Sequence, residues 1–176
     1  MCIRDRYESY GKLFFSEIDA MKKSLFQDWY HQQITFAQFL EKLRSFQLSP
    51  DTCHGLYLLL ADAPGATKEG QLLCSYVPKY ITDYLFPEKY LHLEAELSDS
   101  RQLYFFYPAA GTDFPCSRMK DCVQSLYEHA RPLFQTALSF YLAQVEPCSD
   151  SQRLCTLAEE ALVQIRTATE NNGQTA

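Results

Sequence analysis

Apolar residues recur at helical spacing near the start of the chain. Within residues 10–30, Phe14, Ile18, Met21 and Leu25 are separated by four, three and four residues. This spacing predicts a helix on which the four side chains form one narrow apolar seam. It can pair with the same seam of a second copy in a homodimer, or it can dock on the rest of the chain. Fewer than four heptads do not decide between these two arrangements.

A second helix and a strand follow. Residues 36–46 place their large apolar side chains on one helical face, and Thr35 stands where an N-cap residue is preferred. Residues 54–61 contain an uninterrupted apolar run from Leu56 to Leu60. Such a run is typical of a central strand that is covered on both faces.

The middle of the chain alternates between helical and strand periodicity. Helices are predicted at residues 71–86 and 117–134. Residues 90–97 alternate strictly between apolar and polar positions, and with the strand candidate 102–107 that follows they predict an antiparallel hairpin. The aromatic side chains in these segments are interpreted as core rather than as a ligand site. They are Tyr76, Tyr80, Tyr84, Phe105 and Tyr107.

A last strand and a last helix complete the pattern. Residues 136–145 alternate, and Ser149 with Gln152 forms a candidate capping box for the helix that follows. The apolar stripe of this helix is Leu154, Leu157, Ala158, Ala161, Leu162 and Ile165. After the two leading helices, the order is therefore β-α-β-β-α-β-α. It predicts an α+β fold, a ferredoxin-like antiparallel sheet with helices on one face and one further helix appended.

Composition narrows the class of protein. With 176 residues, of which 47% are hydrophobic and 14% aromatic, the chain can form one domain with a substantial core. The net charge of −6 provides no basic stripe, which argues against nucleic-acid binding by the chain itself. No apolar run approaches the ~20 residues of a membrane helix. The seven cysteines lack C-x-x-C spacing and favour reduced thiols in a cytoplasmic protein over disulfides or zinc.

The last third of the chain carries a family resemblance. Ser139 in the last strand and Ala158, Glu159, Ala161, Leu162 and Arg166 in the last helix fall on matching or chemically similar positions of a GGDEF domain. The hairpin sequence Gly-Gly-Asp/Glu-Glu-Phe of an active diguanylate cyclase is missing from the chain. Tyr141 replaces a family glycine, and its bulk would crowd a nucleotide.

In active members of that family, carboxylates at the end of the first strand and in the hairpin hold divalent metal ions. The corresponding places here contain only Asp62 and Asp99, which we interpret as turn-forming residues. The resemblance therefore implies a cyclase-like domain without catalysis. We expect no metal ion and no cofactor.

A wider resemblance covers residues 16–168. The order of segments is similar to the central region of AraC-type two-component response regulators, which join a receiver, a linker helix, a degenerate GGDEF-like domain and helix-turn-helix units. It divides the chain into four parts. They are residues 1–6, which resemble a translated sequencing adapter; the leading helices, 7–48; the degenerate GGDEF-like domain, 49–168; and a tail or truncated linker, 169–176.

The resemblance implies a regulatory role within a longer protein. We expect a non-catalytic domain that couples a receiver domain to a DNA-binding domain. Both of these would lie in parts of the protein that this sequence lacks, and DNA would be contacted only through the DNA-binding domain. One alternative is a sensor that binds a small ligand or nucleotide without turnover, and another is a scaffold that binds only protein partners. A saturable rise in melting temperature with a nucleotide would favour the sensor.

Overall fold

A computed structural model of the chain describes the backbone of residues 3–46, 48, 55–63, 76–81, 83, 90–98, 100–108, 117–132 and 138–173. Four strands form one antiparallel sheet in the order β2-β3-β1-β4. Their bounds are Leu56–Asp62 for β1, Tyr90–Ser98 for β2, Arg101–Pro108 for β3 and Ser139–Val145 for β4. The predicted hairpin is confirmed, and its pairing shifts register between Glu96 and Ser98.

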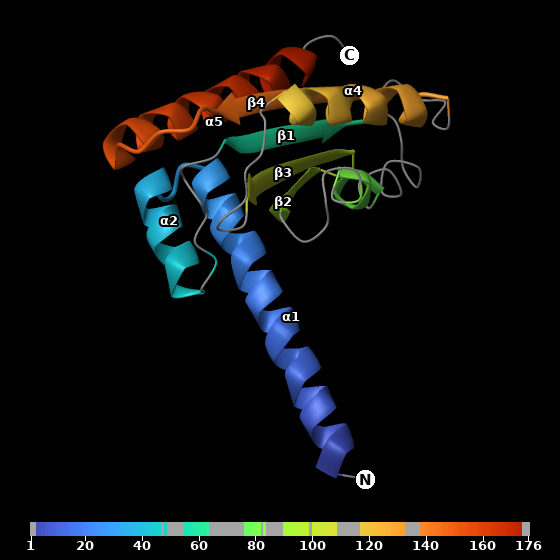
Figure 1. Ribbon diagram of the computed structural model, residues 1–176, viewed down its shortest axis with the longest axis vertical. Helices are drawn as coiled ribbons and strands as arrows, with labels where there is room; N and C mark the ends of the chain where they lie inside the picture. The colour runs from blue at the N-terminus through green and yellow to red at the C-terminus, as the bar shows by residue number, and fades with distance from the viewer. Residues whose placement is uncertain are drawn as a thin grey trace.

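Helices cover both faces of this sheet (Figure 1). One face packs against α1 (Ile3–Tyr30), α2 (Phe36–Ser45) and α5 (Ser151–Gly173). The other face packs against α4 (Ser117–Ala130) and the helical residues 76–81. The α+β class is therefore confirmed. The helical residues 76–81 and α4, which follow the first strand and the hairpin, share one face as predicted, and the appended α5 packs with the leading helices on the other face.

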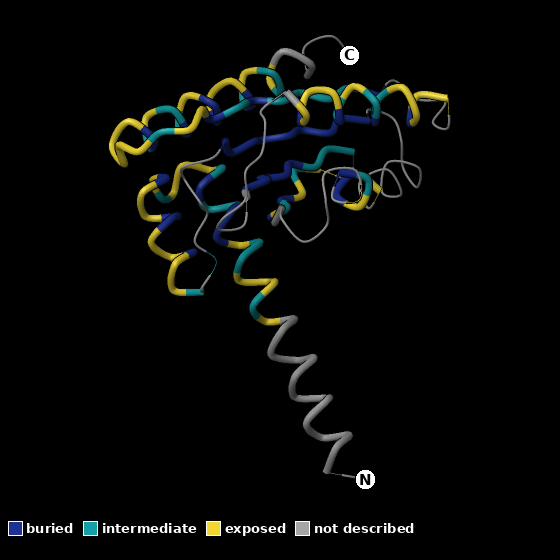
Figure 2. Tube along the Cα trace, in the orientation of Figure 1, coloured by how far each residue is buried: buried dark blue, intermediate teal, exposed yellow. Residues whose placement is uncertain are grey.

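Strand β1 explains why two layers of helix are needed. All seven of its residues are buried (dark blue in Figure 2), as the continuous apolar run predicted. Leu56, Leu58 and Leu60 belong to the core beneath α1, α2 and α5. Tyr57 and Leu59 belong to the core beneath α4. Because successive side chains of a strand point to opposite faces, an apolar residue at every position requires cover on both sides.

An aromatic cluster joins the leading helices to the sheet. The Trp29 ring lies 4.8 Å from Phe36, 5.0 Å from Phe39 and 5.7 Å from Phe105, measured between ring centroids. Phe26 of α1 contacts the same cluster, and these side chains are fully buried. The end of α1 and all of α2 thus share one hydrophobic core with the sheet and α5.

Local hydrogen bonds define the helix ends. The Thr35 hydroxyl accepts from Gln38 N, and the Gln38 side chain accepts from Thr35 N, so the predicted cap of α2 is confirmed as a full capping box. The predicted Ser149 cap of α5 is wrong. Instead, Asp150 Oδ1 accepts from Gln152 N at 2.8 Å and Arg153 N at 3.2 Å. A carboxylate at this place also complements the positive helix N-terminus.

Two helices end at other residues than predicted. Helix α4 ends at Ala130, two residues before Pro132, rather than at 134. Helix α5 continues to Gly173, into the segment 169–176 that the sequence assigned to a tail or truncated linker. None of the helices that the structure describes is long and apolar enough to cross a membrane.

The turn between α1 and α2 contains a backbone conformation that favours glycine. Gln32 has φ = 58°, in the left-handed region. Gln32 N donates to Trp29 O and Gln33 N donates to Asp28 O, which is the hydrogen-bond pattern of a Schellman motif. The residue with positive φ in this motif is usually glycine, because a side chain at this φ costs free energy.

Substituting Gln32→Gly is therefore expected to raise the free energy of unfolding by about 0.5–1 kcal/mol. Urea denaturation followed by circular dichroism measures the change. Gln33→Gly, in the same exposed turn but without a positive φ, is the matched control and should destabilise slightly. Equal effects of the two substitutions would contradict the assignment of the left-handed strain to Gln32.

Candidate functional site

Asp62 lies at the end of β1, where the GGDEF resemblance places a metal-binding carboxylate. It is only 1% exposed, and Arg101 Nε donates to its Oδ2 at 3.1 Å. Asp62 and Arg101 face each other directly in the β1–β3 register. The interpretation of Asp62 as a turn-forming residue is thus wrong, because the residue belongs to the strand and takes part in a cross-strand ion pair. Asp99 lies outside the described residues.

The two partners of this ion pair differ in burial. The Arg101 side chain is 25% exposed, whereas the Asp62 side chain is 1% exposed. Asp62 Oδ1 is buried, and no described group donates a hydrogen bond to it. A buried carboxylate needs a compensating charge, and the guanidinium provides it here. The described residues contain no group of three or more His, Cys, Asp or Glu side chains that could hold a metal ion.

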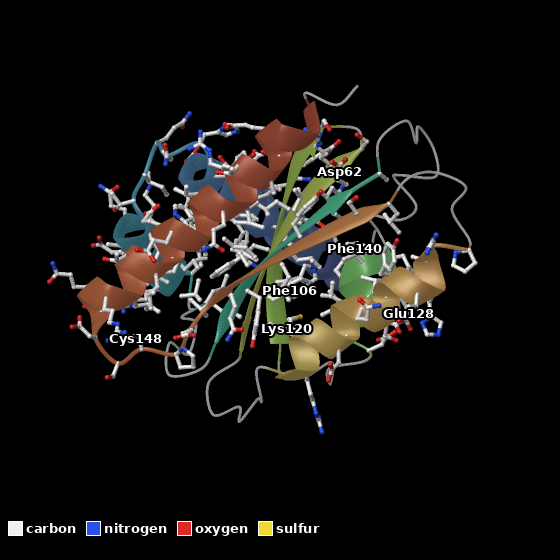
Figure 3. The ribbon with its side chains drawn as sticks, turned by 90° about the horizontal axis from the view of Figure 1, so that it is seen from above. Asp62, Phe106, Lys120, Glu128, Phe140 and Cys148 are labelled. Atoms are coloured by element: carbon white, nitrogen blue, oxygen red, sulfur yellow. The ribbon has the colours of Figure 1, made fainter. Side chains whose placement is uncertain are left out.

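The family-matching serine reaches the same end of the sheet. Ser139 of β4 is the register partner of Asp62 on the side opposite Arg101. Arg101, Asp62 and Ser139 therefore form a row across β3, β1 and β4 at the sheet end where Asp62 is labelled (Figure 3). Tyr141, which pairs with Leu60 two residues further along β4, is half-buried and packs against the core beneath α5.

Glu159 of α5 joins three helices. Its Oε1 accepts a hydrogen bond from Phe36 N at 2.7 Å, and its Oε2 accepts one from Trp29 Nε1 at 3.4 Å. The first contact places a negative charge at the N-terminus of α2, where the helix dipole favours it. The sequence marked Glu159 only as a family match. Its partners are 123 and 130 positions away in the chain, so no local pattern could indicate the contacts.

A groove of about 900 Å³ opens beside Glu159. We call it the α2–α5 groove, because the turn before α2, the first residues of α2 and one face of α5 line it. Its lining residues include Ile34, Phe36, Ala37, Cys155, Glu159 and Val163. Burial raises the pKa of the Cys155 thiol, and the negative charge of Glu159 raises it further. The carboxylate of Glu159 thus gives the wall of the groove a negative charge.

A polar cluster on the other face of the sheet serves structure. Tyr80 Oη lies 2.9 Å from Ser125 Oγ, and His129 Nδ1 lies 2.7 Å from the Ser125 carbonyl oxygen. A carbonyl only accepts, so His129 Nδ1 carries the proton in this contact and cannot take one from the Ser125 hydroxyl. The pair is therefore not arranged as a nucleophile and its base. The cluster ties residues 76–81 to α4.

The predicted aromatic rows are only partly core. Phe105 and Tyr107 are buried as predicted, and burial raises the pKa of Tyr107 to about 12. Tyr80 is half-buried, but Tyr76 is exposed, so the core prediction is wrong for Tyr76. The reason is that this helix is covered on one side alone, through Val77 and Ile81. Tyr84 lies outside the described residues.

Three cysteines lie in the described part of the chain, and all are free thiols. Cys122 belongs to α4 and is buried against the sheet, and burial raises its pKa to about 12. Cys148 and Cys155 are half-buried. None of these three forms a disulfide in the described part of the chain, and the prediction of reduced thiols stays a prediction.

The four seam residues of α1 have different surroundings. Leu25 is buried in the same core as Phe26, Ile18 is half-buried, and Met21 is 54% exposed. The side chain of Phe14 lies outside the described residues. The seam therefore docks on the domain at its C-terminal end, while Met21 remains accessible to a partner.

Comparison with known proteins provides no family for the chain. No protein-family model matches it, and no curated protein sequence matches it.

Proposed function

We propose that the chain is a non-catalytic, signal-transmitting domain of a transcriptional response regulator. Its fold would be a ferredoxin-like, nucleotide-cyclase-like domain of the degenerate GGDEF type. The strand order β2-β3-β1-β4, with a helix after the first strand and another after the hairpin, supports this fold. The resemblance of Ser139 and the α5 motif to the GGDEF family supports the same assignment.

The observation that carries the proposal is the Asp62–Arg101 pair. In a working cyclase the carboxylate at the end of the first strand is available to a divalent cation. Here the guanidinium neutralises that carboxylate at 3.1 Å. A metal ion would have to displace Arg101 or bind beside its positive charge, and both cost free energy. The pair therefore favours a structural role for Asp62 over a metal-binding one.

The transmitting role rests on α1. Its C-terminal end is fixed in the core through Phe26 and Trp29, and its N-terminal part extends away from the sheet (Figure 1). A displacement of α1 imposed by a receiver would act on α5 through the Trp29–Glu159 hydrogen bond. In the proposed full-length protein, α5 then leads toward the helix-turn-helix domain.

Dimerisation through the seam tests this role. The double substitution Ile18→Glu with Met21→Glu is expected to convert a homodimer into a monomer, because it places charges in an apolar contact. Sedimentation equilibrium measures the change in mass. Ser24→Glu is the matched control, since Ser24 is exposed on the same helix and does not belong to the seam.

Two results would count against the proposal. A monomeric unsubstituted protein would show that the seam serves only for docking within one chain. Formation of a cyclic dinucleotide from GTP and magnesium by the purified protein would overturn the non-catalytic assignment.

A further inference from the structure

The α2–α5 groove has the size and the surface of a small-molecule site. Ile34, Phe36, Ala37, Cys155 and Val163 provide its apolar lining. Val163 is 51% exposed although it is a large apolar residue. A volume of about 900 Å³ lies within the range of known ligand cavities, which are mostly apolar with a few placed polar groups.

The charged residues that line the groove are all acidic. Glu159 and Glu160 both line it, and the other polar lining residues are neutral glutamines and threonines. Among the described residues no Lys, Arg or His contributes to its wall. The two hydrogen bonds that Glu159 accepts come from neutral donors, a backbone N–H and an indole N–H. A carboxylate has about four acceptor positions, so Glu159 keeps capacity for a charged donor.

We propose that this groove binds a small amphipathic cation, a molecule with an ammonium or guanidinium group on a hydrophobic body. The cation would contact Glu159, and the hydrophobic body would lie against Ile34, Ala37 and Val163. A charge-assisted hydrogen bond to a half-buried carboxylate is stronger than one between neutral groups. The inference does not depend on the role in signal transmission, because binding requires only the folded chain.

Binding of the cation would change a hydrogen bond between α1 and α5. The hydrogen bond from Trp29 Nε1 to Glu159 Oε2, at 3.4 Å, is longer than the one from Phe36 N to Oε1, at 2.7 Å. A cation that competes for Glu159 would therefore weaken the Trp29 contact first. Trp29 is the one tryptophan of the chain, so tryptophan fluorescence reports on the surroundings of this side chain, which include Glu159.

The test is a fluorescence titration of the full chain with three matched probes. These are 2-phenylethylamine, which is a cation at neutral pH, 2-phenylethanol and 3-phenylpropionate. We expect a saturable change in Trp29 fluorescence with the amine, at an affinity about tenfold above that for the alcohol. The carboxylate probe should bind more weakly still. Equal affinities for the three probes, or no saturable change up to the solubility limit of the amine, would overturn the proposal.

Substitutions locate the binding. Glu159→Gln keeps an acceptor oxygen but removes the charge, so the preference for the amine over the alcohol should vanish. Glu146→Gln, at an exposed position outside the groove, is the control and should keep it. If Glu159→Gln does not fold, Val163→Lys is the second test. Val163 is exposed, so the position tolerates lysine, and the lysine ammonium would repel the amine and remove the preference for it. An unchanged preference in the folded variant would overturn the proposal.

Discussion

Replacing Arg101 with alanine is expected to lower the free energy of unfolding by about 3 kcal/mol, because it leaves a buried carboxylate without its partner. Asp62 is 1% exposed, and in the described part of the chain no group donates a hydrogen bond to its Oδ1. Among the described residues, Arg101 is the one positive charge that pairs with this carboxylate. We place the cost at the lower end of the range for buried pairs, since water reaches the partly exposed guanidinium. Urea denaturation followed by circular dichroism measures the loss.

Two further variants separate this cause from simple loss of packing. Asp62→Leu is nearly isosteric, and combining it with Arg101→Leu removes both charges, which should restore most of the stability. Asp19→Ala breaks the Lys22–Asp19 pair, whose Nζ–Oδ1 distance is a similar 3.0 Å. The Asp19 side chain is 74% exposed, so the substitution should cost less than ~0.5 kcal/mol. An Arg101→Ala variant as stable as the parent would show that water compensates Asp62.

Trp29→Ala is expected to be at least as destabilising, by about 3–5 kcal/mol. The side chain is fully buried among Phe26, Phe36, Phe39 and Phe105, and its loss opens a cavity that these rings cannot fill without moving. It also removes a hydrogen bond to Glu159. Denaturation must be followed by circular dichroism, because the substitution removes the fluorophore.

Two substitutions serve as comparisons for Trp29. Trp29→Phe keeps an aromatic ring and loses the indole N–H, so its cost should be well below that of Trp29→Ala. Ser24→Ala, at an exposed position of the same helix outside the seam, should change stability by less than ~0.5 kcal/mol. If Trp29→Ala cost no more than Ser24→Ala, the end of α1 would not belong to the core.

Much of the fold follows from short-range patterns. The sequence predicted the apolar run of β1, the alternation in β2, the apolar face of α2 and the stripe of α5, because each reflects the pattern of a single element. Helix ends were less predictable. Ser149 and Asp150 are both good N-cap residues, and only the three-dimensional course of the chain decides which of them caps α5.

The candidate sites depended on contacts between distant residues. The sequence showed an aspartate after an apolar run, but its meaning depends on the β1–β3 register, which places Arg101 opposite Asp62. Glu159 likewise looks in the sequence like any acidic residue of a helix. Only the folded structure shows that its carboxylate accepts hydrogen bonds from Trp29 Nε1 and Phe36 N. The sequence by itself determined which elements form and which of their faces are apolar, because periodicity is a local property. Only the tertiary structure decided which charges meet and where a groove remains, because strand register and helix packing are set by the whole core.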